Sequence, residues 1–278
     1  MELPVGFQFS QGNLQDFVDC KRRFFLKYIH SLPWPAMEIE PALENERLLT
    51  QGLLFHKIVH QHLLGFPTER LSQMIHDQDL ERWWRNYLER CDSLFQTSNE
   101  KFVEQTLMIQ LEKYRLISIY DLILHTTDDR FIIIDWKTSL KHPKRTWLAN
   151  RLQTRIYPYL LVQSGMNLIS KRQILPGQIE MLYWFTDYPD QPERFIYNPL
   201  QFERDSSLVI EITREIIALQ EAQFDLTSST ERCQFCVYRS LCERGIGAGE
   251  LDESIEWKEK EFLSAIEAGF DQIVEIEF

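Results

Sequence analysis

The stretch from Ile119 to Lys137 constrains the fold of this chain more than any other. Two apolar runs rich in β-branched residues flank a short polar turn, and this pattern predicts an antiparallel hairpin. Asp121 lies in the first run, whereas Asp135 and Lys137 end the second. Because successive side chains of a strand point to opposite faces, Asp135 and Lys137 should share one face and Trp136 should point to the other.

The charged residues of this hairpin need partners. A charge at the end of so apolar a run is costly to bury unless it is paired. A divalent cation held by the carboxylates of Asp121 and Asp135, with the ammonium of Lys137 beside it, would satisfy all three groups. An ordinary surface ion pair also fits an Asp-x-Lys sequence at a strand end, so the hairpin alone leaves both interpretations open.

Length and hydropathy indicate one large core, or a core domain with an appendage. The chain has 278 residues, of which 44% are hydrophobic. It contains no apolar run of about 18 residues or more, which excludes a helix that spans a membrane. The first residues, Met-Glu-Leu-Pro, lack the basic and then apolar pattern of a secretory signal, so we expect a cytoplasmic protein.

The charge of the chain is unevenly distributed. A net charge of −12 argues against a protein covered by basic surface. From Trp136 to Ile179, however, there is no Asp or Glu and there are eight basic residues, so this segment carries +8 and the rest carries −20. Such a strip predicts a track for a polyanion such as DNA, although a solvated basic helix face would look the same. The basic residues are Lys137, Lys141, Lys144, Arg145, Arg151, Arg155, Lys171 and Arg172.

The cysteines predict a metal site or a cluster. Cys233, Cys236 and Cys242 lie in a polar, loop-like stretch of ten residues. Since cytosolic thiols stay reduced, a disulfide framework is not expected. Cys20, on an expected helix rich in aromatic and basic residues, is the better candidate for the fourth ligand. Cys91 has no cysteine neighbour and is expected to be an ordinary buried thiol. Four thiolates suit zinc as well as an iron–sulfur cluster, so the chemistry leaves both open.

The remaining pattern alternates helices with strands. His56 and His60 are four apart on one expected helix, but Lys57 stands where the general base of a zinc-protease motif would be. Pro158 should bend a later helix or end its first segment. We expect helices over 10–30, 43–64, 78–96, 147–165 and 200–223, strands over 102–111, 179–185 and 194–197, and a solvated acidic tail over 250–278.

Taken in order, these motifs resemble the RecB-like branch of the PD-(D/E)XK nucleases. The resemblance is strongest to members with a C-terminal iron–sulfur cluster, namely AddB-type nuclease domains and the nucleases of CRISPR adaptation. Ser118-Ile-Tyr120 departs from the Gly-x-Ile usual before the aspartate. The matching segments are Gly52-Leu-Leu-Phe-His56, Tyr120-Asp121, Ile134-Asp135-Trp-Lys137 and Gln153-Thr-Arg-Ile-Tyr157, together with Cys20, Cys233, Cys236 and Cys242.

The resemblance implies an α/β restriction-endonuclease-like core, with a central mixed sheet flanked by helices, over residues 36–224. It implies a helical, cluster-binding appendage formed by residues 1–35 and 225–250, followed by the acidic tail over 251–278. His56, Asp121 and Asp135 would bind Mg²⁺ or Mn²⁺, and Lys137 would be the catalytic lysine. Glu104 fits either a contact with a metal-bound water or an ordinary carboxylate on the strand surface. The four cysteines would hold a 4Fe–4S cluster, and Gln153, Tyr157, Arg151 and Arg155 would hold DNA, with Tyr157 stacking on a base.

The expected activity is therefore metal-dependent hydrolysis of DNA. An exonuclease acting on single strands or DNA ends in repair, recombination or CRISPR adaptation fits the resemblance, with a helicase or a CRISPR-adaptation protein as partner. A catalytically silent DNA-binding or subunit-bridging module of the same fold is the alternative, and a zinc protein without nuclease activity is a third interpretation.

Overall fold

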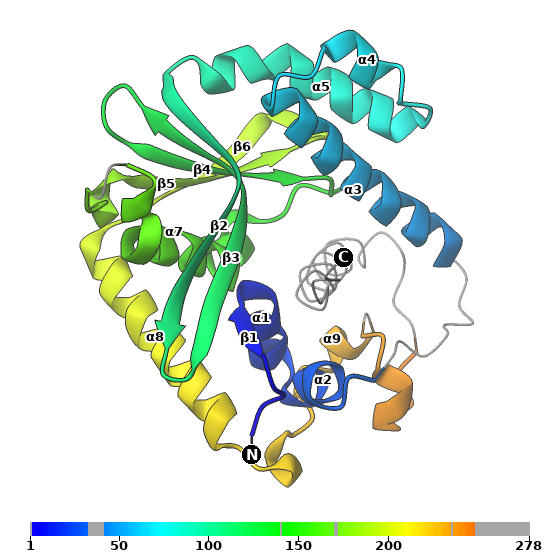
Figure 1. The fold of residues 1–278 in the computed structure, drawn as a ribbon. Helices are drawn as coiled ribbons and strands as arrows, with labels where there is room; N and C mark the ends of the chain where they lie inside the picture. The colour runs from blue at the N-terminus through cyan, green and yellow to red at the C-terminus, as the bar shows by residue number, and fades with distance from the viewer. Residues whose placement is uncertain (1, 33–41, 140, 170–171, 235, 248–278) are drawn as a thin grey trace, which may run out of the picture.

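A six-stranded mixed sheet forms the centre of the molecule (Figure 1). The computed structural model describes residues 2–32, 42–139, 141–169, 172–234 and 236–247. The acidic tail expected over 250–278 lies outside these residues. The strands are β1 (Gln8–Ser10), β2 (Ser98–Leu111), β3 (Tyr114–Thr126), β4 (Phe131–Lys137), β5 (Ile179–Phe185) and β6 (Tyr188–Ile196).

Strand β3 organises this sheet. It pairs antiparallel with β2 along its whole length on one side. On its other side, its first half pairs parallel with β1 and its second half pairs antiparallel with β4. The predicted hairpin is thus confirmed, with Leu122 opposite Ile134 and His125 opposite Phe131. Beyond it, β4 runs parallel to β5, and β6 closes the sheet antiparallel to β5.

Helices cover both faces of the sheet, and each face has its own core (Figure 1). On one face, α3 (Ala42–Leu63), α4 (Thr68–Ser72) and α5 (Gln78–Phe95) pack over a core that contains Trp83, Trp136 and Trp184. On the other face, α1 (Gln11–Asp19), α7 (Leu152–Ser164) and α8 (Pro199–Ala218) pack over a core that contains Phe9 and Tyr183. Both faces of the central strands are buried, which explains their nearly continuous apolar sequence.

The helix expected over 147–165 consists of two helices. They are α6 (Arg145–Ala149) and α7, and the break falls at Asn150 and Arg151. Pro158 lies inside α7 and does not end it. A proline removes one backbone hydrogen bond from a helix. Burial of Leu160 and Leu161 on the sheet offsets that loss.

The N-terminal segment is also more divided than its pattern predicts. Ser10 caps α1, with its hydroxyl accepting from the Asn13 N–H at 3.2 Å. The helix then stops at Cys20, whose backbone is extended. A short α2 (Lys21–Phe24) and a π-helix over Phe25–Ile29 follow. Figure 1 shows these elements beside α9 (Thr230–Cys233), so the two cysteine-bearing ends of the sequence meet.

Within the described residues, no helix has the length and apolar character needed to cross a bilayer.

Candidate active site and cysteine cavity

The end of β4 carries a closed set of polar contacts. Asp135 and Lys137 face α7 and are buried, while Trp136 packs against Tyr87 of α5 on the opposite face, as the alternation predicts. The Lys137 Nζ lies 2.6 Å from the Asp135 Oδ2. The Gln153 Nε2 donates to the Asp135 Oδ1 at 2.5 Å, and its Oε1 accepts from the Lys137 Nζ at 3.1 Å. Gln153 of α7 therefore fixes the carboxylate and the ammonium together.

The second carboxylate, Asp121, is tied to the same strand end. Its Oδ2 accepts from the Trp136 backbone N–H at 3.0 Å. Its Oδ1 lies 3.3 Å from the Nδ1 of His56 on α3. One octahedral cation with bonds near 2.1 Å would hold neighbouring ligand atoms about 3 Å apart. The spacing of His56 and Asp121 is thus close to that of two ligands of one ion.

Gly52 explains how α3 comes so near the end of β4. A Cβ at this position would lie 2.9 Å from the Thr138 Oγ1, which is closer than carbon and oxygen normally approach. Thr138 directly follows Lys137 and is buried. Because the helix can pack this closely only with glycine there, His56 one turn later reaches Asp121.

The two carboxylates titrate differently. Burial raises the pKa of Asp135, and the negative charge of Asp121 raises it further against the opposing effect of Lys137. Burial would also raise the pKa of Asp121, but the neighbouring His56 and the hydrogen bond from Trp136 hold that pKa below its usual value. The buried Asp135 and the half-buried Asp121 repel each other, which favours a cation between them. Carboxylate oxygens with one imidazole suit Mg²⁺ or Mn²⁺.

The four cysteines predicted to act together line one cavity. Cys20 reaches it from the break between α1 and α2, and Cys233, Cys236 and Cys242 reach it from the C-terminal segment. Burial raises the pKa of the Cys242 thiol, and the adjacent Cys20 and Cys233 raise it further. All five cysteines carry free thiols, and Cys91 lies apart, buried in α5 as expected.

The walls of this cavity are strongly basic. Four arginines line it alongside the cysteines, and the Nη1 of Arg244 lies 3.6 Å from the Cys233 Sγ. Cationic neighbours stabilise thiolates, which are the form that binds metals. The four are Arg23, Arg232, Arg239 and Arg244.

Among the described residues, no three His, Cys, Asp or Glu side chains converge closely enough to hold a single ion. At the end of β4, the Asp135 Oδ2 faces the Lys137 ammonium, which takes the place that a metal ion would occupy beside this carboxylate. Joint coordination with His56 and Asp121 requires Asp135 to give up that contact.

Comparison with known proteins agrees with this arrangement. The sequence profile described as the PD-(D/E)XK nuclease superfamily matches residues 8–243. This chain belongs to the PD-(D/E)XK nuclease superfamily. The mixed sheet flanked by helices is accordingly the restriction-endonuclease-like α/β fold that the sequence predicts. The search of curated proteins found no match to this member of the superfamily.

Two solved structures resemble this superfamily member. One is a protein from Eubacterium rectale named a "putative exonuclease", with 9% identity and a TM-score of 0.52, covering 90% of this chain and 97% of that one. At that identity the likeness concerns the fold alone. The other is SSO0001, with 15% identity and a TM-score of 0.43, covering 88% of this chain and 90% of that one.

A second acid–histidine pair lies beside the first in this nuclease-superfamily chain. Glu104 of β2 stands opposite Asp121 and has a left-handed backbone with φ of 44°. Its Oε1 lies 3.0 Å from the Nδ1 of His60, one turn after His56. In a regular strand, Tyr120 and Leu122 would point to the same face of the sheet. Here they belong to opposite cores, so β3 is irregular beside Asp121. Glu104, for which a metal-bound water was one expected partner, contacts His60 in the structure. The four-residue spacing of His56 and His60, which places both on one helix face, was the sequence feature that pointed to this partner.

Three of the four residues predicted to hold DNA are buried. Gln153 binds the acid and the lysine of β4, and Arg151 pairs with Asp19 at 3.4 Å. The Tyr157 ring is only 3% exposed and packs against Tyr120 with ring centroids 4.7 Å apart. The expectation that Tyr157 stacks on a base therefore requires correction, because its ring offers no open face.

The basic strip is also largely neutralised by acids from other elements. The Arg155 Nε donates to the buried Asp205 of α8 at 2.5 Å, although a quarter of its side chain stays accessible. Within the described residues, Arg145, Arg151, Arg155 and Arg172 form such ion pairs, whereas Lys137 pairs with Asp135 of its own strand. DNA contact by Arg151 and Arg155 stays a prediction, and the strip carries less net charge than its sequence indicates.

Proposed function

We propose that this chain is a metal-dependent DNA nuclease that hydrolyses phosphodiester bonds, and that it acts as an exonuclease on single strands or DNA ends. The observation that carries the proposal is the assembly of His56, Asp121, Asp135 and Lys137 from α3, β3 and β4. Membership of the nuclease superfamily supports the reaction type.

Each of these side chains has a role that its contacts support. His56, Asp121 and Asp135 would hold Mg²⁺ or Mn²⁺, and the bound cation would polarise the scissile phosphate and lower the pKa of a bound water. Lys137, oriented by Gln153, would position the attacking water or offset charge that develops on the phosphate oxygens.

We further propose that the cysteine cavity holds a 4Fe–4S cluster, within a region formed by residues 1–35 and 225–250. In a 4Fe–4S cluster each of the four thiolates binds a different iron, so the sulfurs need not converge on one ion as around zinc. The spread of thiols in an arginine-lined cavity therefore favours the cluster over a single zinc. Its task would be structural, because it would join segments more than 200 residues apart in sequence.

A catalytically silent DNA-binding module is the rival function. Helicase or CRISPR-adaptation partners and a cytoplasmic location would be compatible with either function. The intact acid–lysine pair, held by Gln153 at hydrogen-bond distance, favours the enzyme.

The decisive experiment is digestion of end-labelled single- and double-stranded DNA with Mg²⁺ or Mn²⁺ by anaerobically purified protein. We expect EDTA, Asp121→Asn and Lys137→Ala to abolish cleavage. Asp205→Asn alters a fully buried acid away from the site and should leave cleavage within about threefold of wild type. Metal-independent DNA binding without cleavage would instead establish the silent module.

A further inference from the structure

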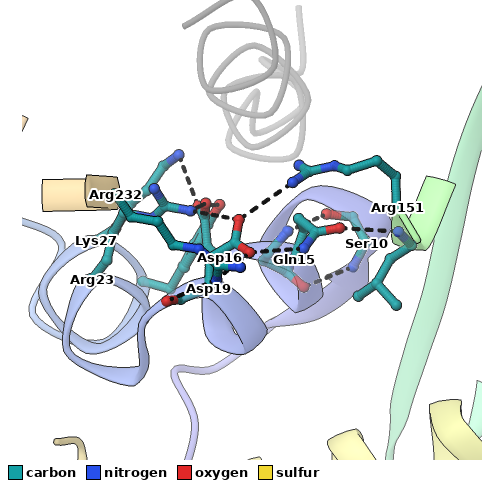
Figure 2. A network of polar contacts seen from close by, with 11 residues as sticks. Ser10, Gln15, Asp16, Asp19, Arg23, Lys27, Arg151 and Arg232 are labelled. Atoms are coloured by element: carbon teal, nitrogen blue, oxygen red, sulfur yellow. Dashed lines mark hydrogen bonds and ion pairs between the residues drawn. The ribbon is translucent and has the colours of Figure 1, made fainter. Parts of the chain in front are cut away.

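Asp19 makes contacts toward both proposed sites. It directly precedes Cys20, lines the cysteine cavity and is 2% exposed. Its Oδ1 accepts from the Nη1 of Arg232 at 2.7 Å, and Arg232 directly precedes Cys233. Figure 2 shows how Asp19 draws α1, the arginine next to the C-terminal cysteines and the start of α7 together. The carboxylate thus joins the two backbone segments that supply Cys20 and Cys233.

The same carboxylate also organises the start of α7. Its Oδ2 lies 3.4 Å from the Nη1 of Arg151, and its Oδ1 accepts from the Nε2 of Gln15 at 3.1 Å. The Gln15 Oε1 in turn accepts from the Leu152 N–H at 2.9 Å. A carboxylate can only accept hydrogen bonds. Asp19 therefore orients the Gln15 amide with its NH₂ group toward Asp19 and its carbonyl oxygen toward α7.

This contact is important for α7 because its first N–H has no acceptor within the helix. Arg151, the residue before the helix, supplies no side-chain cap. Gln15 therefore caps α7 from another helix, and the orientation of its amide depends on Asp19. The next residue of α7 is Gln153, which holds Asp135 and Lys137.

The charges around Asp19 supply an independent observation. Two buried acids, Asp16 and Asp19, face four cations, so the cluster carries a charge of +2 by difference. Asp16 is fully engaged, with Arg23 at 2.7 Å, Lys27 at 3.2 Å and the Tyr28 hydroxyl at 2.8 Å. The cations are Arg23, Lys27, Arg151 and Arg232.

Three of these cations are largely buried, whereas the Arg232 side chain is 36% exposed. An excess of positive charge beside four thiols matches a thiolate-bound group of negative charge. Arg23 and Arg232 line the cavity and also contact Asp19, so they are shared between the contents of the cavity and the carboxylate. Emptying the cavity would leave the Arg232 guanidinium to Asp19 and that of Arg23 to Asp16 and Asp19, so both would compete more strongly with Gln15 and Arg151 for the Asp19 carboxylate.

We propose that Asp19 is a positioning residue that couples occupancy of the cysteine cavity to the geometry of the Asp135–Lys137 pair through Gln15 and the start of α7. This inference rests on the proposed function for both sites. It adds a thermodynamic link between them, in which cluster and divalent cation strengthen each other's binding.

The test measures Mn²⁺ affinity by calorimetry without DNA, on cluster-loaded protein and on protein stripped anaerobically with a chelator. For wild type, we expect stripping to weaken Mn²⁺ binding by about 5–50-fold. In Asp19→Asn the loaded protein should already bind weakly, and stripping should change the affinity less than about twofold. Asp205→Asn is the matched control, because it disturbs the ion pair between the buried Asp205 of α8 and Arg155 of α7, away from the cavity, and it should keep the wild-type ratio.

A second variant and a second measurement guard against unfolding of the stripped protein. Gln15→Leu removes the bond to Leu152 but leaves the ion pairs of Asp19 in place. In cluster-loaded protein, Asp19→Asn and Gln15→Leu should both speed amide exchange of Leu152 by about tenfold or more, and Asp205→Asn should not.

The outcomes separate the two levels of the argument. Wild-type protein that binds no Mn²⁺ would overturn the proposed nuclease site, and wild-type protein without an iron–sulfur cluster would overturn the proposed content of the cavity. Either result would overturn this coupling as well. Mn²⁺ binding that is indifferent to stripping, or equally weakened in Asp19→Asn and Asp205→Asn, would overturn the coupling alone.

Discussion

Replacing Gln153 with leucine tests whether this residue organises the active site or touches DNA. Gln153 is 6% exposed, and its amide binds the Asp135 carboxylate at 2.5 Å and the Lys137 ammonium at 3.1 Å. Leucine fills a similar volume but makes neither bond. The acid and the lysine would then lose the side chain that binds both of them, while keeping their mutual contact at 2.6 Å.

The expected loss of stability follows from these two bonds. A hydrogen bond to a charged group contributes about 1.5–3 kcal/mol, so losing two would cost at most about 6 kcal/mol. Because Asp135 and Lys137 keep their mutual ion pair and leucine gains apolar burial, we expect the free energy of unfolding to fall by about 2–4 kcal/mol. Urea unfolding measures this difference.

The kinetic consequence should be larger than the effect on DNA binding. Displacing a catalytic group by about 1 Å can cost on the order of 100-fold in rate, so we expect turnover to fall by about 10–100-fold. The dissociation constant for single-stranded DNA, measured without divalent cation, should stay within about twofold of wild type. Gln163→Leu is the control, because Gln163 lies exposed on the same helix. A variant with unchanged stability and turnover but tenfold weaker DNA binding would refute the positioning role.

Three further predictions concern the metal site and the cavity. Mn²⁺ affinity should fall as the pH drops through the raised pKa of Asp135, because a proton then competes with the cation at a higher pH than for an ordinary aspartate. Calorimetry across pH measures this, and an affinity that declines only below the usual pKa range of aspartate would contradict it. Gly52→Ala should lower both the stability and the Mn²⁺ affinity, because the new Cβ would lie 2.9 Å from the Thr138 Oγ1. Alanine in a helix is normally more stabilising than glycine by about 1 kcal/mol, so a raised urea midpoint would contradict this prediction. Cys236→Ser should lower the bound iron or zinc and the melting temperature, whereas Cys91→Ser should preserve the metal content; equal metal loss in both variants would exclude the cavity as the binding site.

Local patterns predicted the elements that position the site. Alternation along β4 placed Asp135 and Lys137 on one face and Trp136 on the other, and a polar turn between two apolar runs predicted the hairpin. The cap at Ser10 was likewise local, since the hydroxyl and the N–H that it binds are three residues apart. These features depend on backbone geometry over a few residues, so the sequence is sufficient to predict them.

Pairing between distant residues did not follow from the pattern. The basic strip looked like an open track because the acids that neutralise it lie far away in sequence, as with Arg155 and Asp205, fifty residues apart. The sequence predicted a DNA contact for Gln153, whereas in the structure its side chain binds Asp135 of β4. Similarly, the predicted stacking of Tyr157 of α7 on a base is not possible in this arrangement, because Tyr120 of β3 covers its ring.

The sequence by itself determined the hairpin, the shared face of its acid and lysine, and the set of cysteines worth considering together. The tertiary structure alone decided that Asp19 would join Arg232, 213 residues away, to the start of α7. The physical reason is that strand alternation and helix caps depend on neighbouring residues. Which carboxylate meets which guanidinium depends instead on how the packed layers bring distant segments together, and burial then requires each charge to find a partner.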